Sequence, residues 1–374
     1  MMDDSPVTAS SPPANQDAAT ATSRPFRRIV VALFGAIGDV ILSTPLLEAL
    51  RTAFPQAHLT YLVGSTAAPV LANLPLLDDL LIVPDYKGAP RWNDVQLFAR
   101  IARQRFDLAF CLSRSEKLAL AFWLARVPVR VGYLPMKFPR MFTYLIDGDE
   151  LGEAHRTEYF LAAAVKLGIP KSKPVRLHYQ VMPAERDAAR AMLKGAGADP
   201  ERESLIAIHP GTSTVQIDKR RWAVENFVAV ASHIARRGSR VILLGGPDEL
   251  DAAGAFRNSL PGQFVDMTGR LGLRQLAAVL EQCTALVHND SSPLHLAGAV
   301  GTPVLAIFGY QNQKLWGPLG RHDRVVRRDL ACSPCLPEFP CPYSFECIRK
   351  LNAATVIEAL DAMLDRLECH RVRA

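Results

Sequence analysis

The chain has 374 residues, of which 49% are hydrophobic and 21% are charged, a balance typical of soluble proteins with substantial cores. This composition excludes a mostly disordered chain, a coiled coil and a small disulfide scaffold, and the length predicts two domains. The formal net charge of +6 suits a phosphate-bearing ligand or an anionic membrane surface. Because no basic block alternates with aromatic residues, we expect no nucleic-acid partner.

The first 25 residues are rich in Ala, Ser, Pro and Thr and lack the basic and apolar regions of a signal peptide. We therefore expect residues 1–25 to form a disordered tail. The most apolar stretch, residues 118–129, contains Arg126 and is too short to span a bilayer. These features predict a cytoplasmic protein whose seven cysteines are thiols or metal ligands rather than disulfides.

From residue 27 onward, short runs of β-branched residues alternate with longer amphipathic stretches, which predicts βα units around a mainly parallel sheet. The strands predicted in the first half cover residues 29–33, 59–63, 80–83, 107–111 and 129–132, and the helices cover 39–53, 95–104, 117–124 and 157–167. Gly168 and Pro170 end the last of these helices. The proline-containing segment 171–183 is interpreted as a linker.

The same pattern restarts after the linker. Strands are predicted at 205–208, 240–244, 285–288 and 304–308, and helices at 227–237, 273–282 and 294–300. The sequence therefore predicts an α/β protein with two Rossmann-like domains facing a central cleft, where ligands bind at the carboxyl ends of the strands. We expect a first domain at 26–180, a second at 181–350, and a C-terminal helix at 351–374 that packs back on the first domain.

The first strand is followed by Gly35-Ala-Ile-Gly-Asp39, a glycine-bearing turn that leads into a helix. The dinucleotide fingerprint G-x-G-x-x-G is absent, which argues against NAD. Asp39 lies in the first helical turn. It either complements the positive end of the helix or is presented to a substrate hydroxyl as a general base.

Three motifs in the second half contain residues suited to a phosphate or a ribose. Gly211, Thr212 and Ser213 follow a strand and can bring amides and hydroxyls close to a phosphate, or form a tight turn. Lys219 and Arg220 can neutralise a pyrophosphate or lie on a solvated surface. Glu249 follows paired glycines and can hold ribose hydroxyls or begin a helix.

The segment His288-Asn-Asp-Ser-Ser-Pro-Leu-His-Leu296 gives the strongest local signal. Asp290 or Ser291 can cap the next helix, and Pro293 suits its first turn. The exposed amides at such a helix start form an anion site, which Ser292 borders. His295 taken alone is a packed histidine more often than a ligand.

Together these motifs resemble the heptosyltransferase family of lipopolysaccharide assembly, whose members are glycosyltransferases with two Rossmann-like domains of the GT-B type. The resemblance implies that Asp39 is the catalytic base and that the second-half motifs bind the diphosphate and nucleoside of the donor. The chain departs from the family pattern at Arg220, where Lys is usual, and at Ser292, where Gly is usual. It also has Gly309-Tyr-Gln311 where Gly-Pro-Thr is frequent.

The resemblance implies an inverting, metal-independent transfer of heptose from ADP-heptose to a lipopolysaccharide core acceptor, with no cofactor required. Gly38 and Lys117 are candidates for acceptor binding. The protein is expected to associate peripherally with the inner membrane, and candidate cations for that contact are Lys117, Arg130, Lys137, Arg140 and Arg156. The alternatives are another sugar nucleotide, an O-antigen or protein acceptor, and a non-catalytic sugar-nucleotide-binding protein.

Four cysteines, Cys332, Cys335, Cys341 and Cys347, are closely spaced in a proline-rich segment. Four thiolates can hold structural zinc or an iron–sulfur cluster. The second pair does not have the Cys-x2-Cys spacing of a metal site. We therefore favour free thiols and keep a structural metal as the alternative.

Overall fold

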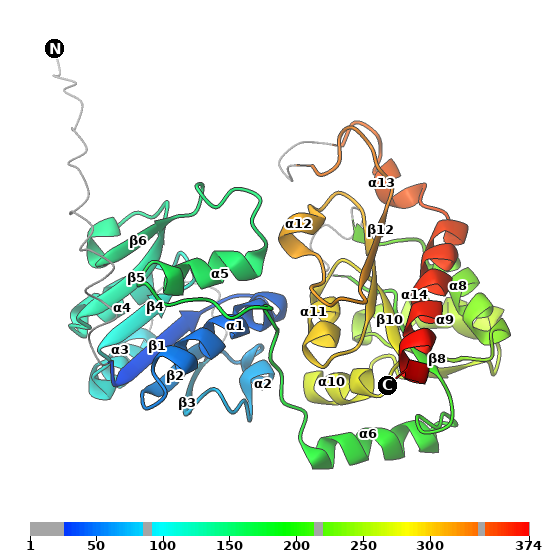
Figure 1. Cartoon of the computed structure of the whole chain (residues 1–374), viewed down its shortest axis with the longest axis horizontal. Helices are drawn as coiled ribbons and strands as arrows, with labels where there is room; N and C mark the ends of the chain where they lie inside the picture. Colours follow the sequence, from blue (N-terminus) through cyan, green and yellow to red (C-terminus); the bar gives the residue numbers. More distant parts are fainter. Residues whose placement is uncertain (1–25, 85–91, 213–219, 336–340, 374) are drawn as a thin grey trace.

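The computed structural model describes residues 26–84, 92–212, 220–335 and 341–373. The predictions for residues 1–25, Ser213 and Lys219 lie outside these ranges. Two lobes stand side by side, each a sheet covered by helices (Figure 1). We call the lobe built on β1–β6 the first lobe and the lobe built on β7–β12 the second lobe.

The sheet of the first lobe has six parallel strands in the order β3-β2-β1-β4-β5-β6. The strands are β1 (Arg28–Leu33), β2 (His58–Gly64), β3 (Asp79–Val83), β4 (Leu108–Cys111), β5 (Val129–Leu134) and β6 (Tyr144–Asp147). Strand β1 pairs with both β2 and β4, and Ile29 lies opposite Leu59 and Leu108. This is the strand order of a dinucleotide-binding sheet, so the first Rossmann-like unit is confirmed.

The helices of the first lobe follow the predicted alternation. They are α1 (Ile37–Ala53), α2 (Ala68–Leu71), α3 (Trp92–Gln104), α4 (Glu116–Leu124), the 3-10 turn η2 (Pro139–Met141) and α5 (Arg156–Val165). Helix α1 continues through Pro45, which cannot donate a hydrogen bond to the Ile41 carbonyl. The Thr44 hydroxyl donates to that carbonyl instead, at 2.7 Å, so the carbonyl keeps a hydrogen-bond donor.

The second sheet repeats this topology, with its six strands in the order β12-β11-β10-β7-β8-β9. The strands are β7 (Leu205–His209), β8 (Arg240–Leu243), β9 (Phe264–Asp266), β10 (Ala285–Asn289), β11 (Val304–Phe308) and β12 (Arg324–Arg327). The helices and 3-10 turn are α6 (Pro183–Gly195), α8 (Val224–Arg236), η3 (Pro247–Glu249), α9 (Leu250–Ser259), α10 (Leu273–Glu281), α11 (Ser292–Ala299), α12 (Gln313–Trp316), α13 (Glu346–Arg349) and α14 (Ala353–Arg373).

The C-terminal helix α14 packs on the second lobe. Its buried side chains Val356, Leu360 and Met363 join the hydrophobic cluster formed with α8 and the second sheet, and α14 lies beside α8 in Figure 1. The prediction that 351–374 packs back on the first domain is therefore wrong. An apolar face at helical spacing shows that a helix is partnered, but it does not identify the partner.

The two lobes meet where α1 lies against α11, and α2 lies against α10. One continuous cluster of buried apolar side chains includes Val40 and Ile41 from α1 together with Leu294 and Ala297 from α11. In a parallel α/β sheet, the carboxyl end of each strand leads into the N-terminus of the helix that follows it. The contact between α1 and α11 therefore brings the carboxyl ends of strands from both sheets to the gap between the two lobes.

Candidate active site

Asp39 lies in the first turn of α1, at the junction of the two lobes, as the sequence predicts. Its Oδ1 is 3.4 Å from Nε of Arg156, and the two side chains are partly exposed. The Arg156 guanidinium lies over the Tyr159 ring at 4.3 Å and over Trp316, in the second lobe, at 5.6 Å. The carboxylate is thus held by a cation that contacts both lobes, and it remains accessible to solvent.

The residue before Asp39 makes a close contact between the lobes. The Gly38 amide donates to Ser292 Oγ at 3.2 Å. A Cβ at Gly38 would lie 3.1 Å from Ser292 Oγ and 3.3 Å from His295 Cδ2. A side chain here would crowd the N-terminus of α11, so Ser292 or His295 would have to shift by a few tenths of an ångström.

Side chains join the ends of β7 and β10. Asn289 donates from Nδ2 to the Pro210 carbonyl at 2.7 Å, and its Oδ1 accepts from the Trp222 amide at 3.2 Å. His288 lies 2.7 Å from the His209 carbonyl and 2.8 Å from Ser291 Oγ. These bonds fix the two predicted phosphate-binding turns against each other.

Arg220 lies next to the loop that follows β11. Its Nε donates to the Tyr310 hydroxyl at 3.2 Å. Its charge also acts on Asp290, where burial raises the carboxyl pKa to about 6 and Arg220 opposes that rise. The structure therefore brings together a guanidinium, a phenol and a buried carboxyl at the strand ends of the second lobe.

Glu249 lies within the same group of loops, at the end of η3. Its Oε2 accepts from the Gly246 amide at 2.6 Å, and burial raises its pKa. A Cβ on Gly211 would lie only 2.2 Å from Glu249 Oε1. The glycine of the His209-Pro-Gly-Thr turn is thus what allows this carboxylate to lie against that turn.

A cavity of about 240 Å³ opens between these loops and the start of α1. It is lined by the following residues from both lobes: Ile37, His209, Gly245, Gly246, Leu271, Leu273, Leu276, Ser292, Pro293 and Leu296. The mixture of apolar side chains and glycine backbone is typical of a site for a flat ring with a few polar edges.

Among the described residues, several buried polar atoms around these strand ends have no hydrogen-bond partner: His209 Nδ1, Thr212 Oγ1, Asp290 Oδ2 and His295 Nδ1. Buried polar atoms are usually paired. Burial lowers the pKa of His209 to about 4 and of His295 to about 3, so both rings are neutral at pH 7. Neutral imidazoles and a hydroxyl without partners indicate a place for a polar ligand.

The cysteines of the second lobe are free thiols. Burial, then the neighbouring thiols Cys335, Cys341 and Cys332, raise the pKa of Cys347. Within the part of the chain that the structure describes, no three or more His, Cys, Asp or Glu side chains are grouped so that they could hold a metal ion. Residues 336–340, between the second and third of these cysteines, lie outside the described ranges, and a structural metal held by the four thiols stays a prediction.

The predicted membrane-contact cations fall into two groups. Lys117, Lys137 and Arg140 are exposed on or beside α4. Arg130 is instead bonded to the backbone, donating to the Met141 carbonyl at 2.6 Å, and Arg156 lies beside Asp39, so both cations have partners within the protein. Among the described helices, none is both long and apolar enough to cross a membrane.

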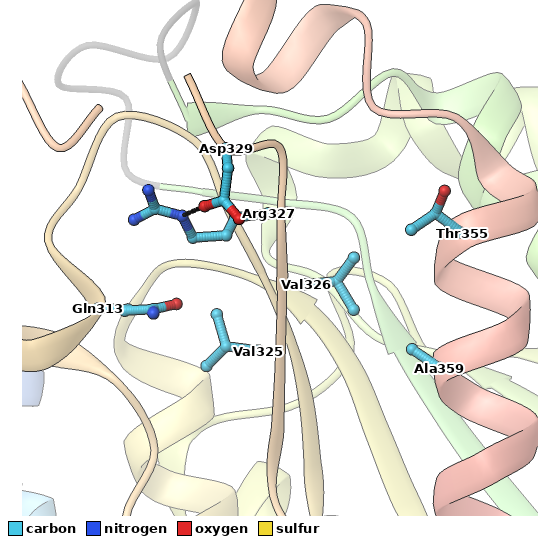
Figure 2. A pocket seen from close by; sticks show the side chains of 7 residues that line it. All are labelled: Gln313, Val325, Val326, Arg327, Asp329, Thr355 and Ala359. Atoms are coloured by element: carbon cyan, nitrogen blue, oxygen red, sulfur yellow. Dashed lines mark hydrogen bonds and ion pairs between the residues drawn. The ribbon is translucent and has the colours of Figure 1, made fainter. Parts of the chain in front are cut away.

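A second cavity, of about 390 Å³, lies between β12 and α14. Figure 2 shows its two charged side chains, Arg327 and Asp329, paired with each other, and their Nε–Oδ1 distance is 2.8 Å. Arg327 also donates to the Ser333 carbonyl at 3.1 Å. Because its cation already has partners, we assign no ligand to this cavity.

Sequence reasoning missed the contacts of two site residues. Arg156 was expected at a membrane surface, and Trp316 was given no role. Both come from helices that are distant in sequence from Asp39, and neither belongs to a motif. Only the packing of α5 and α12 at the junction of the lobes places them there.

Comparisons with known proteins agree with this geometry. A family model described as glycosyltransferase family 9 (heptosyltransferase) matches residues 95–342. Lipopolysaccharide heptosyltransferase 2 of Salmonella typhimurium is 24% identical over 302 residues, covering 78% of this chain and 85% of that protein.

Two solved structures have the same architecture. A family 9 glycosyltransferase from Veillonella parvula superposes with a TM-score of 0.78 and 26% identity, covering 91% of this chain and 97% of that one. The ADP-heptose lipopolysaccharide heptosyltransferase II of E. coli gives a TM-score of 0.73 at 20% identity, with coverages of 91% and 99%. The fold is therefore of the GT-B type, and the chain belongs to glycosyltransferase family 9, the heptosyltransferases.

Proposed function

We propose that this protein transfers a heptose from ADP-heptose to a sugar of the lipopolysaccharide core, with inversion at the anomeric carbon. The observation that carries the proposal is the hydrogen bond between Gly38 and Ser292. It joins the first turn of α1, which carries Asp39, to the N-terminus of α11, and a helix N-terminus is a natural site for a diphosphate. The names of the relatives above support ADP-heptose as donor and lipopolysaccharide as acceptor.

In the proposed reaction, the Asp39 carboxylate accepts the proton of the acceptor hydroxyl. The hydroxyl oxygen attacks the anomeric carbon and forms the new C–O bond, while the bond to the donor phosphate breaks and its electron pair leaves with ADP. A general base in this position typically contributes about 10²–10⁴ in rate. Arg156 orients the carboxylate. To reach that carboxylate, the acceptor hydroxyl must also come close to the Arg156 guanidinium.

The departing diphosphate would be stabilised by charge and dipoles of the second lobe. Arg220 supplies a guanidinium, and the amides at the start of α11 supply the positive end of a helix. Lys219 is a further candidate by its place in the sequence. We propose that these groups supply the positive charge for the leaving group, so that the reaction is independent of a divalent cation.

The nucleoside is proposed to occupy the cavity of about 240 Å³. Pockets that enclose a whole drug-sized ligand measure about 300–1,000 Å³, so this cavity suits the base rather than the complete nucleotide sugar. Glu249 lies at the edge of the loops around this cavity and is the candidate partner of the ribose hydroxyls. Gly211 and Thr212 would face the phosphates.

Acceptor binding is proposed for the first lobe. Gly38 lies beside the catalytic carboxylate, and Lys117 lies exposed in the first turn of α4. Because the proposed acceptor is part of a lipid, the protein would act at the cytoplasmic face of the inner membrane. We therefore propose peripheral association with that membrane.

A donor panel tests the proposal. ADP-heptose and matched ADP-, GDP- and UDP-sugars are incubated with truncated core acceptors in the presence and absence of a chelator. We expect transfer from ADP-heptose alone, unaffected by the chelator, and a product of inverted anomeric configuration by NMR. Transfer from another sugar nucleotide would identify that compound as the donor in place of ADP-heptose. Binding without turnover of any donor would indicate a non-catalytic protein.

A further inference from the structure

The net charge of the chain is concentrated in one segment of the first lobe. Residues 92–143 contain nine Lys or Arg and three Asp or Glu, an excess of six that equals the formal net charge of the whole protein. Eight of these cations are exposed: Arg100, Arg103, Arg105, Arg114, Lys117, Arg126, Lys137 and Arg140. Of the three acids, Asp107 already accepts hydrogen bonds from the backbone amides of Arg27 and Arg28.

The same segment exposes large apolar side chains. Trp123 and Leu124, at the end of α4, are 51% and 53% exposed, and Phe138, just before η2, is 43% exposed. Single exposed apolar residues are ordinary on a protein surface, whereas a group bordered by polar residues indicates an interaction site.

Hydrogen bonds bring together the two elements that carry the exposed apolar side chains. The half-buried Arg130 donates from Nε to the Met141 carbonyl at 2.6 Å and from Nη1 to the Val127 carbonyl. Because Val127 follows the end of α4 and Met141 ends η2, these bonds hold the two elements side by side, and α4 also packs on η2. We define the α4–η2 surface as Trp123, Leu124, Arg126, Lys137, Phe138 and Arg140.

The turn that ends α4 presents a charged side chain where glycine is usual. Arg126 has a φ of +56°, in the left-handed region that glycine occupies at most such helix ends. Arginine at position 126 places an additional cation near Trp123. In Figure 1, α3 and α4 lie on the side of the first lobe that faces away from the second lobe.

We propose that the α4–η2 surface binds the headgroup region of an anionic lipid bilayer. Aromatic rings and the aliphatic stems of Lys and Arg enter the interface, while the charged ends contact lipid phosphates. Anionic headgroups attract each nearby cation, and the attraction falls with salt. This inference deepens the proposed function, since a lipid-linked acceptor is presented at such a surface.

Co-sedimentation with vesicles tests the surface without using the reaction. The full-length protein is mixed with vesicles of phosphatidylcholine alone, or of phosphatidylcholine with phosphatidylglycerol, at low and high salt. We expect binding only to the vesicles that contain phosphatidylglycerol, and weaker binding at high salt. Two double variants, Trp123→Ala/Leu124→Ala and Lys137→Gln/Arg140→Gln, should each weaken this binding about tenfold or more.

Matched controls are available in the second lobe. Tyr343 is 54% exposed and the Arg202 side chain is 86% exposed, so Tyr343→Ala and Arg202→Gln remove an aromatic ring and a cation elsewhere. Both should leave vesicle binding unchanged, and all variants should bind ADP as the wild type does. No binding of the wild type to anionic vesicles, or equal losses in the controls, would overturn the proposal.

Transfer to a soluble, delipidated core acceptor separates this inference from the proposed function. Transfer without vesicle binding would refute the α4–η2 surface and leave the function standing. Vesicle binding without transfer would support the α4–η2 surface and refute the proposed function.

Discussion

At the scale of single residues, the candidate donor site depends on side chains that are buried before any ligand arrives. Glu249 and Asp290 are carboxyl groups whose pKa values are raised by burial. Asp290 Oδ2 and Thr212 Oγ1 are among the buried polar atoms that lack a partner within the described residues. Polar groups held in this state lose little further hydration when a ligand binds, which favours recognition of its polar groups.

The glycine at position 211 gives a direct test of the Glu249 assignment. A methyl group there would lie 2.2 Å from Glu249 Oε1, so Gly211→Ala must displace the carboxylate. If Glu249 holds the ribose, affinity for ADP should fall about tenfold, or about 1.4 kcal/mol, in calorimetry. Gly254→Ala is the matched control, since a Cβ on Gly254 meets nothing within 4 Å.

The double variant Gly211→Ala/Glu249→Ala removes both the methyl clash and the carboxylate. It should bind ADP no worse than Glu249→Ala alone. An additive loss of affinity in the double variant would show that Gly211 acts through the phosphates or the backbone instead of through Glu249.

The raised pKa of Asp290 predicts a pH dependence. The folded protein holds this proton with a pKa of about 6, whereas the usual pKa of an aspartate is 3.8. The residue therefore contributes stability below about pH 4, which is lost as the pH rises through about 6. A diphosphate binds less well beside an ionised carboxylate than beside a protonated one.

Affinity for ADP-heptose should accordingly decrease several-fold between about pH 5 and pH 7. The Asp290→Asn variant stays neutral and should show a flat profile over the same range. A wild-type profile that is equally flat, or affinity that increases with pH, would contradict the placement of Asp290 beside the diphosphate.

At the scale of elements, the contact between α1 and α11 sets the distance between the catalytic base and the diphosphate site. A Cβ on Gly38 would lie 3.1 Å from Ser292 Oγ. We expect Gly38→Ala to lower kcat at least about tenfold, because small displacements of reacting groups cost up to about 10²-fold. Steady-state kinetics with both substrates measures this loss, and ADP affinity should stay within about twofold of wild type.

Removing the opposing hydroxyl should relieve part of that effect. In Gly38→Ala/Ser292→Gly, the nearest atom to the new methyl group is absent, so kcat should recover in part. No recovery, together with an unchanged ADP affinity, would mean that Gly38 is needed for its backbone conformation and not for the approach of α11.

The strands also show which elements can be predicted from sequence patterns. The predicted buried strands are all present, whereas β6, β9 and β12 were missed, and each is at an edge of its sheet. These three strands are short or bordered by charge: β9 has only three residues, and β12 begins and ends with arginine, whereas the edge strand β3 has the apolar run 80–83 and is predicted. The three missed strands lack the apolar run that identifies a buried parallel strand.

The positions of the motifs could be predicted because they follow strands directly. Asp39, Gly211, Glu249 and Asp290 all lie after β-strands, as their sequences indicate. The Arg156–Asp39 pair could not be predicted, since it joins residues 117 positions apart through helix packing. Packing partners are fixed by tertiary structure, not by local periodicity.

At the scale of the whole molecule, Arg274 connects parts that must stay in register. From α10 its Nη1 donates to the carbonyls of Pro69 and Ala72 in the first lobe, each at 3.1 Å. Its Nη2 donates to the Gln180 carbonyl at 2.7 Å, and the guanidinium pairs with Glu185 in α6. One side chain thus joins both lobes and the segment between them.

Arg274→Gln should loosen the two lobes. We expect the free energy of unfolding to fall by about 1–3 kcal/mol, because carbonyls that lose a charged donor remain partly buried, and the apparent Tm to fall with it. Thermal unfolding measures this change, with Arg202→Gln, an exposed cation of the second lobe, as control. Equal Tm values for Arg274→Gln and wild type would show that the other contacts between the lobes hold them together without Arg274.

The proposed mechanism depends on Asp39 acting as the base across the gap between the lobes. The most direct measurement is turnover of ADP-heptose by Asp39→Asn with a core acceptor, alongside ADP affinity by calorimetry. We predict a fall in kcat of about 10²–10⁴ with ADP affinity within about twofold of wild type. Turnover close to that of the wild type would contradict the proposed mechanism.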